Sequence, residues 1–170
     1  MLKVGIIGPE STGKSSLARY LAKRYKGTCV PEYARAYVER KGTIEVTYDE
    51  LCEIAQHQIA EMESLTGEAG LTAQRSYSGT VLQAKPVFFD TELIVTKVWF
   101  DYAFGRVPEW LEEAIKRYPM DVYLLTYPDL PWVPDAARSN GSDAIRMELF
   151  NRYEAEIQAL NIPYYIIKHQ

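Results

Sequence analysis

The sequence contains a motif that is typical of phosphate binding, G-x-x-x-x-G-K-[ST], at residues 8–15. Glycine in such a loop lets the backbone wrap around a phosphate with its N–H groups pointing inward. Lys14 is expected to reach the β- and γ-phosphates of a nucleotide, and the Ser15 hydroxyl is expected to ligate Mg²⁺. The residues expected around the phosphates are Gly8, Glu10, Ser11, Thr12, Gly13, Lys14, Ser15 and Ser16. The sequence therefore predicts a nucleotide-binding protein.

Two carboxylates follow apolar stretches that are typical of strands, and both could take part in phosphoryl transfer. Asp90 has the position of the second carboxylate of P-loop proteins, which holds Mg²⁺ through water. It could also cap a helix, and the two roles are compatible. Glu32 could accept the proton of an attacking hydroxyl or bind sugar hydroxyls. Alternatively, Glu32 is a first-turn acidic residue that complements a helix dipole.

A proline-rich loop at residues 127–141 carries Arg138 and Asp135. P-loop kinases have a mobile lid in this position, whose arginine meets the transferring phosphate and excludes water. Arg138 is therefore a candidate catalytic residue, together with Lys14, Glu32 and Asp90, and Asp135 could orient it. The alternative is a solvated loop arginine.

Several other side chains could contact a substrate. Arg35 could meet a phosphate, or pair with Glu39 one helical turn on. Trp99 and Tyr102 could stack on a nucleobase or hold a cationic ring, or they could pack in the core. Glu92 could contact the substrate or be only a helix residue. The complete set of substrate candidates is Glu32, Tyr33, Arg35, Glu92, Trp99 and Tyr102.

Strands and helices are expected to alternate along the chain. Strands are predicted at residues 2–7, 28–30, 86–90, 121–126 and 163–168, and helices at 14–25, 32–41, 92–103 and 108–117. Two further helices are predicted to begin at a capping box, residues 47–50, and at an N-cap, Ser142. Residues 65–85 are expected to form an irregular insertion. The pattern indicates an α/β fold with a parallel sheet of about five strands and helices on both faces. Ligands bind beyond the carboxyl ends of such strands, where the motif, Glu32, Asp90 and the lid loop can converge.

The composition limits the classes of function. The 170 residues are expected to form a single domain, 1–170. A net charge of −4 without a basic run argues against nucleic acid or an anionic membrane as the main partner. Two cysteines match no metal-binding spacing, and neither a leader nor a membrane span is visible. A cytoplasmic protein is therefore expected.

Five blocks of sequence resemble a known family. They read GPESTGKS, PEYAR, FFDTE with Trp99 downstream, PWVPDAARSNGS and PYYII, and their order resembles the NadR-type ribosylnicotinamide kinase domain over nearly the whole chain. The resemblance implies a three-layer P-loop fold, related to nucleoside and nucleotide kinases, with a small lid loop. It implies ATP and Mg²⁺ as cofactors and phosphorylation of the ribose 5′-hydroxyl of nicotinamide riboside, which yields nicotinamide mononucleotide for NAD salvage. Glu32 and Asp90 match acidic positions of the family's active site, and Arg138 matches its lid arginine.

Two alternatives stay open at this point. The chain could be a kinase for another nucleoside, nucleotide or sugar on the same scaffold. It could also be a regulatory NTPase that binds a nucleotide and a protein partner. A guanine-specific switch usually carries an N-K-x-D motif, and the sequence contains none.

Overall fold

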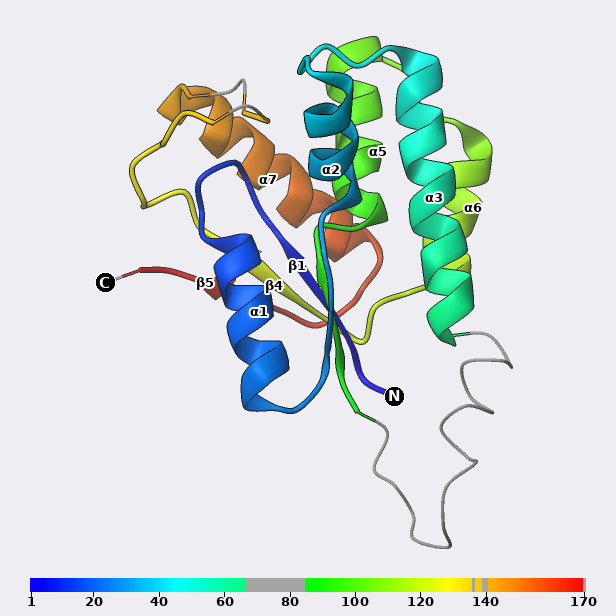
Figure 1. Cartoon of the computed structure of the whole chain (residues 1–170), viewed down its shortest axis with the longest axis vertical. Coiled ribbons are helices and arrows are strands. Elements are labelled where there is room, and N and C mark those ends of the chain that lie inside the picture. The colour runs from blue at the N-terminus through cyan, green and yellow to red at the C-terminus, as the bar shows by residue number, and fades with distance from the viewer. Residues whose placement is uncertain (67–84, 136, 139–140, 170) are drawn as a thin grey trace, which may run out of the picture.

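A single parallel sheet organises the part of the chain that the computed structural model describes, namely residues 1–66, 85–135, 137–138 and 141–169. Its strands follow the order β2-β3-β1-β4-β5 (Figure 1). Their bounds are β1 Lys3–Ile7, β2 Thr28–Val30, β3 Val87–Asp90, β4 Val122–Thr126 and β5 Tyr164–Ile167. All four pairings are parallel. The predicted five-stranded parallel sheet is thus confirmed.

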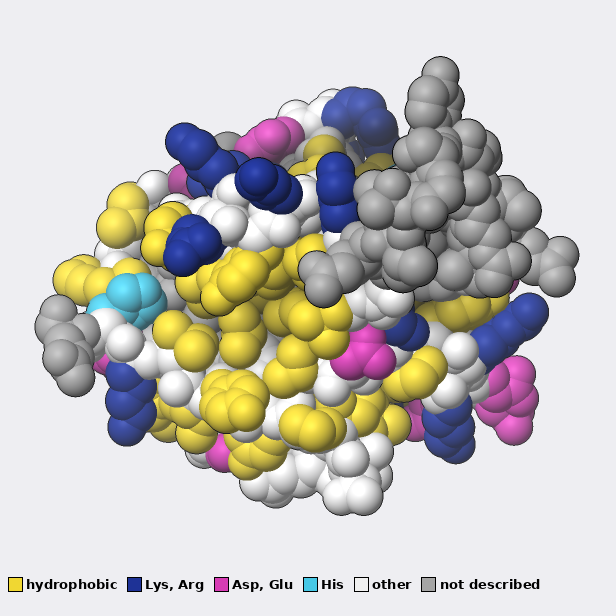
Figure 2. All heavy atoms as spheres, turned by 90° about the horizontal axis from the view of Figure 1, so that it is seen from below, with side chains coloured by type: hydrophobic (Ala, Val, Ile, Leu, Met, Phe, Trp, Pro, Cys, Tyr) yellow, Lys and Arg dark blue, Asp and Glu magenta, His cyan; other side chains and the backbone are white. Residues whose placement is uncertain are grey.

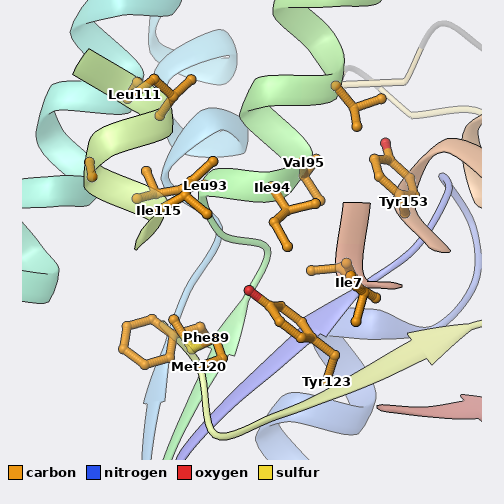
Figure 3. Close-up of a cluster of buried hydrophobic side chains, with 14 of the residues drawn as sticks. Ile7, Phe89, Leu93, Ile94, Val95, Leu111, Ile115, Met120, Tyr123 and Tyr153 are labelled. Carbon is orange, nitrogen blue, oxygen red and sulfur yellow. The ribbon is translucent and has the colours of Figure 1, made fainter. Parts of the chain in front are cut away.

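The helices lie on both faces of this sheet, as predicted. Their bounds are α1 Lys14–Arg24, α2 Tyr33–Lys41, α3 Tyr48–Thr66, α5 Leu93–Phe104, α6 Glu109–Arg117 and α7 Asp143–Ala159. Figure 1 shows α1 on one side of the strands, with α3, α5, α6 and α7 grouped on the other. The helices on this second side bury the larger core, and ten of its residues are labelled in Figure 3. The result is a three-layer α/β fold.

The face that α1 covers carries a smaller core. Val4, Ile6 and Phe88 from the sheet pack there against Ala18 and Ala22 of α1. Figure 2 shows that hydrophobic side chains also gather over much of the surface seen from below. The exposed large hydrophobic residues in the described ranges are Leu2, Tyr20, Tyr25, Ile44, Val133, Tyr165 and Ile166. Within those ranges, no helix is both long enough and apolar enough to span a membrane.

Local signals in the sequence placed most element ends within two residues. The predicted capping box of α3 forms: the Glu50 amide donates to Thr47 Oγ1 over 3.2 Å, and the Thr47 amide donates to Glu50 Oε2 over 2.8 Å. Ser142 occupies the N-cap position of α7, but its side chain makes no capping hydrogen bond. The predicted insertion at residues 65–85 was wrong at its start, because α3 continues through Thr66. Residues 67–84 lie outside the described ranges.

The sheet register gathers the polar strand ends at one edge. Ile6 of β1 lies opposite Asp90 of β3, and Ile7 lies opposite Leu125 of β4. The residues that follow β1, β2, β3 and β4 therefore leave the sheet side by side. This edge carries residues 8–15, Glu32, Asp90 and the start of the lid loop.

Candidate phosphoryl-transfer site

The loop at residues 8–13 adopts a shape that glycine makes possible. Gly8 and Gly13 have φ angles of 153° and 78°, which L side chains rarely adopt. A Cβ on Gly8 would also lie 2.2 Å from Thr126 Oγ1 of β4, so a side chain has no space there. Thr12 Oγ1 lies 2.8 Å from the Pro9 carbonyl and 2.6 Å from Thr126 Oγ1. Backbone conformation and these contacts hold the loop at the start of α1.

A hydrogen bond to the loop backbone holds the Lys14 side chain. Its Nζ donates to the Pro9 carbonyl oxygen over 2.7 Å. Burial lowers the pKa of Lys14, whereas the carboxylates of Glu32, Asp90 and Glu10 act in the opposite direction. A partly desolvated ammonium group among acidic side chains gains stability when an anion approaches, which suits a phosphate contact.

A cleft of about 560 Å³ includes this loop in its lining, and two chemically different sets of side chains line it. The polar set comprises the loop, Glu32, Arg35 and Arg138. The apolar set, on α2, α3, α5 and the segment that joins α2 to α3, comprises Val38, Ile44, Val46, Leu51, Ile54, Val95, Trp99, Ala103 and Phe104. We call the part of the cleft that this apolar set lines the apolar chamber. A ring can be held there by contact with apolar and aromatic groups while its polar substituent faces the loop.

Glu32 lines the cleft together with the loop and the apolar side chains. It occupies the N-cap position of α2 in an extended conformation, directly after β2 and Pro31, and lines the cleft. Burial raises the pKa of Glu32; Lys14 and Arg35 oppose this effect, while Asp90 and Glu10 reinforce it. A carboxylate with a raised pKa, beside a bound hydroxyl, is suited to accept a proton.

Asp90 and Ser15 supply oxygen atoms that fit Mg²⁺. Asp90 is 4 % exposed, and its Oδ1 has no hydrogen-bond partner among the described residues. Such a carboxylate oxygen needs a cation or a water molecule nearby. The described residues contain no group of three His, Cys, Asp or Glu side chains that could hold a metal ion. A carboxylate and a hydroxyl oxygen are donors of the kind that Mg²⁺ takes from a protein, its other ligands being water and substrate phosphates.

Thr91 was not singled out from the sequence, although it lines the cleft beside Asp90. Its φ angle is 70°, which is a true outlier for a β-branched residue. Its hydroxyl is buried and has no hydrogen-bond partner among the described residues. Strained residues of this kind persist only where the surrounding structure fixes them, and they cluster at functional sites.

The lid loop is fastened to residues 10 and 11. Trp132 Nε1 donates to Glu10 Oε2 over 3.1 Å, and the Val133 amide donates to Ser11 Oγ over 3.0 Å. Arg138 lines the cleft, and its Nη1 donates to the Val133 carbonyl oxygen over 2.6 Å. The structure thus brings Arg138 to the same cleft as Lys14 and Glu32.

Comparison with known proteins agrees with this arrangement. A family model described as an AAA domain matches residues 3–170. The chain belongs to this AAA-domain family. It is 28% identical over 170 residues to the trifunctional NAD biosynthesis/regulator protein NadR of Escherichia coli (strain K12). The match covers 98% of this chain and 38% of that relative, so the AAA domain spans well under half of the relative's length.

Two solved structures share the fold of this AAA domain. One is the NadR protein in complex with NAD and AMP-PNP, with a TM-score of 0.73 and 22% identity, covering 99% of this chain and 44% of that chain. The other is the NadR protein in complex with NR, with a TM-score of 0.68 and 21% identity, covering 97% of this chain and 43% of that chain. The AAA domain is thus a P-loop, kinase-like domain related to NadR.

Arg146 of α7 was not selected from the sequence, although it connects three parts of the AAA domain. It is 1% exposed. Its guanidinium donates to the carbonyl oxygens of Glu10, over 3.2 Å, and Leu130, over 2.8 Å, and pairs with Asp143 over 3.3 Å. Arg146 therefore ties the phosphate-binding loop to the base of the lid loop. The spacing of apolar residues predicts which face of a helix is buried, but it does not predict that a polar side chain is buried there.

Replacing Arg146 with methionine is expected to lower the free energy of unfolding by about 2–3 kcal/mol, because two buried carbonyl groups lose a charged donor. Urea denaturation measures this change. Arg152→Met on the same helix is the matched control, since its ion pairs with Asp101 and Glu148 are solvent-exposed and worth below about 1 kcal/mol. Equal stability of Arg146→Met and the wild type would contradict the connecting role of Arg146.

Three of the substrate candidates do not line the cleft of the AAA domain. Tyr33 stacks on His57 of α3, with ring centroids 3.6 Å apart. Tyr102 packs edge-on against Trp99, with ring centroids 5.7 Å apart. Glu92 is buried at the N-cap of α5, where it accepts a hydrogen bond from the Ile94 amide over 3.0 Å. The candidates that do line the cleft are Glu32, Arg35 and Trp99.

Glu92 instead predicts a pH dependence of stability. Burial raises its pKa from 4.5 to about 8. The folded protein therefore binds one more proton than the unfolded chain between these pH values, and stability falls as pH rises through this interval. Glu92→Gln is expected to flatten this fall, which amounts to at most about 1.4 kcal/mol per pH unit. Urea denaturation at pH 5 and pH 8 tests it, with exposed Glu113→Gln as control. If the free energy of unfolding of Glu92→Gln fell with pH as steeply as that of the wild type, Glu92 would not be the origin of the pH dependence.

Proposed function

We propose that this chain is an ATP-dependent kinase that phosphorylates the 5′-hydroxyl of a nucleoside-like acceptor, with nicotinamide riboside as its preferred acceptor. The observation that carries the proposal is the continuity of the cleft. The loop at residues 8–15, Glu32 and the apolar chamber all line one cavity, and the Glu32 carboxylate is close enough to Lys14 to affect its pKa. A donor nucleotide at the loop and a ring in the chamber would place the acceptor's hydroxyl near Glu32.

Each residue of the polar set has a part in such a transfer. The loop and Lys14 hold the donor phosphates and offset the charge that develops on the transferring group. The oxygen of the substrate's hydroxyl group bonds to the γ-phosphorus while the bond between that phosphorus and the ADP leaving group breaks. Glu32 takes up the proton of the hydroxyl group in this step. Arg138 offsets charge on the transferring group. Ser15 and, through water, Asp90 would hold Mg²⁺, which would supply positive charge to offset the charge of the phosphates.

Charges around the cleft favour a hydroxyl acceptor over a phosphate acceptor. A nucleoside monophosphate needs a cation near the acceptor end of the cleft. Arg35 lines the cleft, but three carboxylates lie within ion-pair distance of it: Glu32 at 3.7 Å, Glu39 at 3.6 Å and Asp135 at 3.2 Å. A second phosphate group beside Arg35 would therefore compete with three carboxylates for that guanidinium.

The apolar chamber suits a cationic ring in particular. Its lining includes the aromatic side chains of Trp99 and Phe104, and aromatic faces attract cations. The carboxylates of Glu32 and Asp90, which act on Lys14, would also attract a positively charged pyridinium ring. The NadR protein, whose fold this chain shares, has been solved in complex with NR and with AMP-PNP.

The decisive experiment is a substrate panel with purified protein and Mg-ATP. ADP formation is measured with nicotinamide riboside, adenosine, cytidine, uridine, deoxynucleosides and nucleoside monophosphates. We expect nicotinamide riboside to give the largest kcat/KM. Stronger stimulation by another nucleoside would preserve the kinase and reject the nicotinamide acceptor. Tight binding of nucleotide without stimulation by any acceptor would reject the kinase proposal and favour a regulatory NTPase.

A further inference from the structure

A continuous row of charged side chains runs from Glu32 to Arg138. Glu32 Oε2 lies 3.7 Å from Arg35 Nε, Arg35 Nη1 lies 3.2 Å from Asp135 Oδ2, and Asp135 Oδ2 lies 2.9 Å from Arg138 Nε. The row begins after β2, crosses the first turns of α2 and ends in the lid loop. Its first and last members, Glu32 and Arg138, both line the cleft.

Asp135 is the branching point of this row. One carboxylate oxygen, Oδ2, meets both Arg35 and Arg138, while the other, Oδ1, accepts a hydrogen bond from the Ala137 amide over 2.8 Å. Partial burial opposes ionisation, but the Ala137 amide, Arg35 and Arg138 together lower the pKa of Asp135. The side chain is thus a fixed anion that shapes the lid turn and anchors Arg138.

Arg35 is shared between competing anions. It lies within ion-pair distance of Glu32, Glu39 and Asp135 at once, and one guanidinium cannot meet three carboxylates with equally good geometry. A ligand hydroxyl that donates a hydrogen bond to Glu32 weakens the hold of Glu32 on Arg35. Arg35 can then pair more closely with Asp135, which fixes the turn that carries Arg138.

We propose that Asp135 is a positioning residue that couples the two substrate sites: acceptor bound at Glu32 strengthens nucleotide binding at the phosphate-binding loop through Arg35, Asp135 and Arg138. This coupling rests on the proposed function for the identity of its acceptor, a polyhydroxylated nucleoside. The positioning of Arg138 by Asp135 does not depend on that identity. By linkage, the nucleotide strengthens acceptor binding by the same factor.

Calorimetric titration with Mg-AMP-PNP tests the proposal without turnover. In the wild type, saturating nicotinamide riboside is expected to tighten AMP-PNP binding by about fivefold or more. In Asp135→Asn, the ratio of the AMP-PNP affinities with and without nicotinamide riboside is expected to fall to about one. AMP-PNP alone is expected to bind about three- to tenfold more weakly, because Arg138 loses its ion pair with Asp135. Asp135→Glu, which keeps the charge, should recover part of both effects.

A matched control uses a similar ion pair elsewhere. Asp101 pairs with Arg152 over 2.8 Å on the outer surface of α5 and α7, and neither residue lines the cleft. Asp101→Asn should leave both the ratio and the AMP-PNP affinity unchanged, and thermal unfolding checks that each variant is folded. If Asp135→Asn keeps the wild-type ratio or the wild-type AMP-PNP affinity, the proposal is overturned. If nicotinamide riboside fails to bind the wild type, the acceptor assignment fails, and the AMP-PNP affinity of Asp135→Asn still decides the role of Asp135.

Discussion

Replacing Lys14 with alanine is expected to lower kcat/KM for phosphoryl transfer by about 10²–10³-fold or more, since one preorganised donor at the developing charge is lost. The ammonium group lies inside the phosphate-binding loop, 2.7 Å from the Pro9 carbonyl oxygen, before any nucleotide arrives. It is therefore positioned without rearrangement during the reaction. Acceptor-dependent ADP formation measures the loss, and thermal unfolding verifies that the variant is folded.

The control for this variant is Lys23→Ala. Lys23 is exposed in the last turn of α1, so the substitution removes the same charge from the same helix without touching the cleft. It should retain nearly all activity. If Lys14→Ala retained full activity as well, the assignment of residues 8–15 to donor binding would be wrong.

Replacing Glu32 with glutamine is expected to lower kcat by about 10²–10⁴-fold, the range of general acid–base catalysis. It should also remove the acidic limb of the pH–rate profile. Because burial raises the pKa of Glu32, the wild-type rate should begin to fall at a higher pH than for an ordinary glutamate of pKa 4.5. At a pH below the raised pKa of Glu32, its carboxyl group is protonated and cannot take up the proton of the substrate's hydroxyl group. Initial rates between pH 4.5 and pH 9 measure both effects.

Glu39→Gln separates the chemistry of Glu32 from its electrostatics. Glu39 is also within ion-pair distance of Arg35, at 3.6 Å, but it does not line the cleft. Its replacement should leave the acidic limb in place. If Glu32→Gln kept its kcat but raised KM for the acceptor, Glu32 would bind the ribose and would not act as the base.

The features of this fold that could be predicted from sequence are those with local causes. The strand at residues 28–30 was placed without error because Gly27 and Pro31 bound it. The convergence of the loop, Glu32 and Asp90 followed from topology, since parallel strands present their carboxyl ends at one edge. These predictions needed hydrophobic pattern, turn residues and one general rule about sheets.

What the sequence did not reveal depends on side-chain direction and distant contacts. Glu92 was a substrate candidate whose alternative was a plain helix residue, and its side chain is buried at the N-cap of α5. Tyr33 follows Glu32, but helical geometry turns it toward His57. Arg146 is held by carbonyl groups that lie 16 and 136 residues away in sequence. Such relations are fixed only when the elements have packed.

The position of β1 in the middle of the sheet has a consequence for biosynthesis. The phosphate-binding motif leaves the ribosome before β3 and β4, but β1 pairs with both of these strands, which end at Asp90 and Thr126. The loop also needs the Thr126 hydroxyl against Thr12. These long-range pairings require closure of large loops, which slows folding. A nascent chain that ends before β4 should therefore not yet bind nucleotide, and this ability should arise only after β4 has been synthesised.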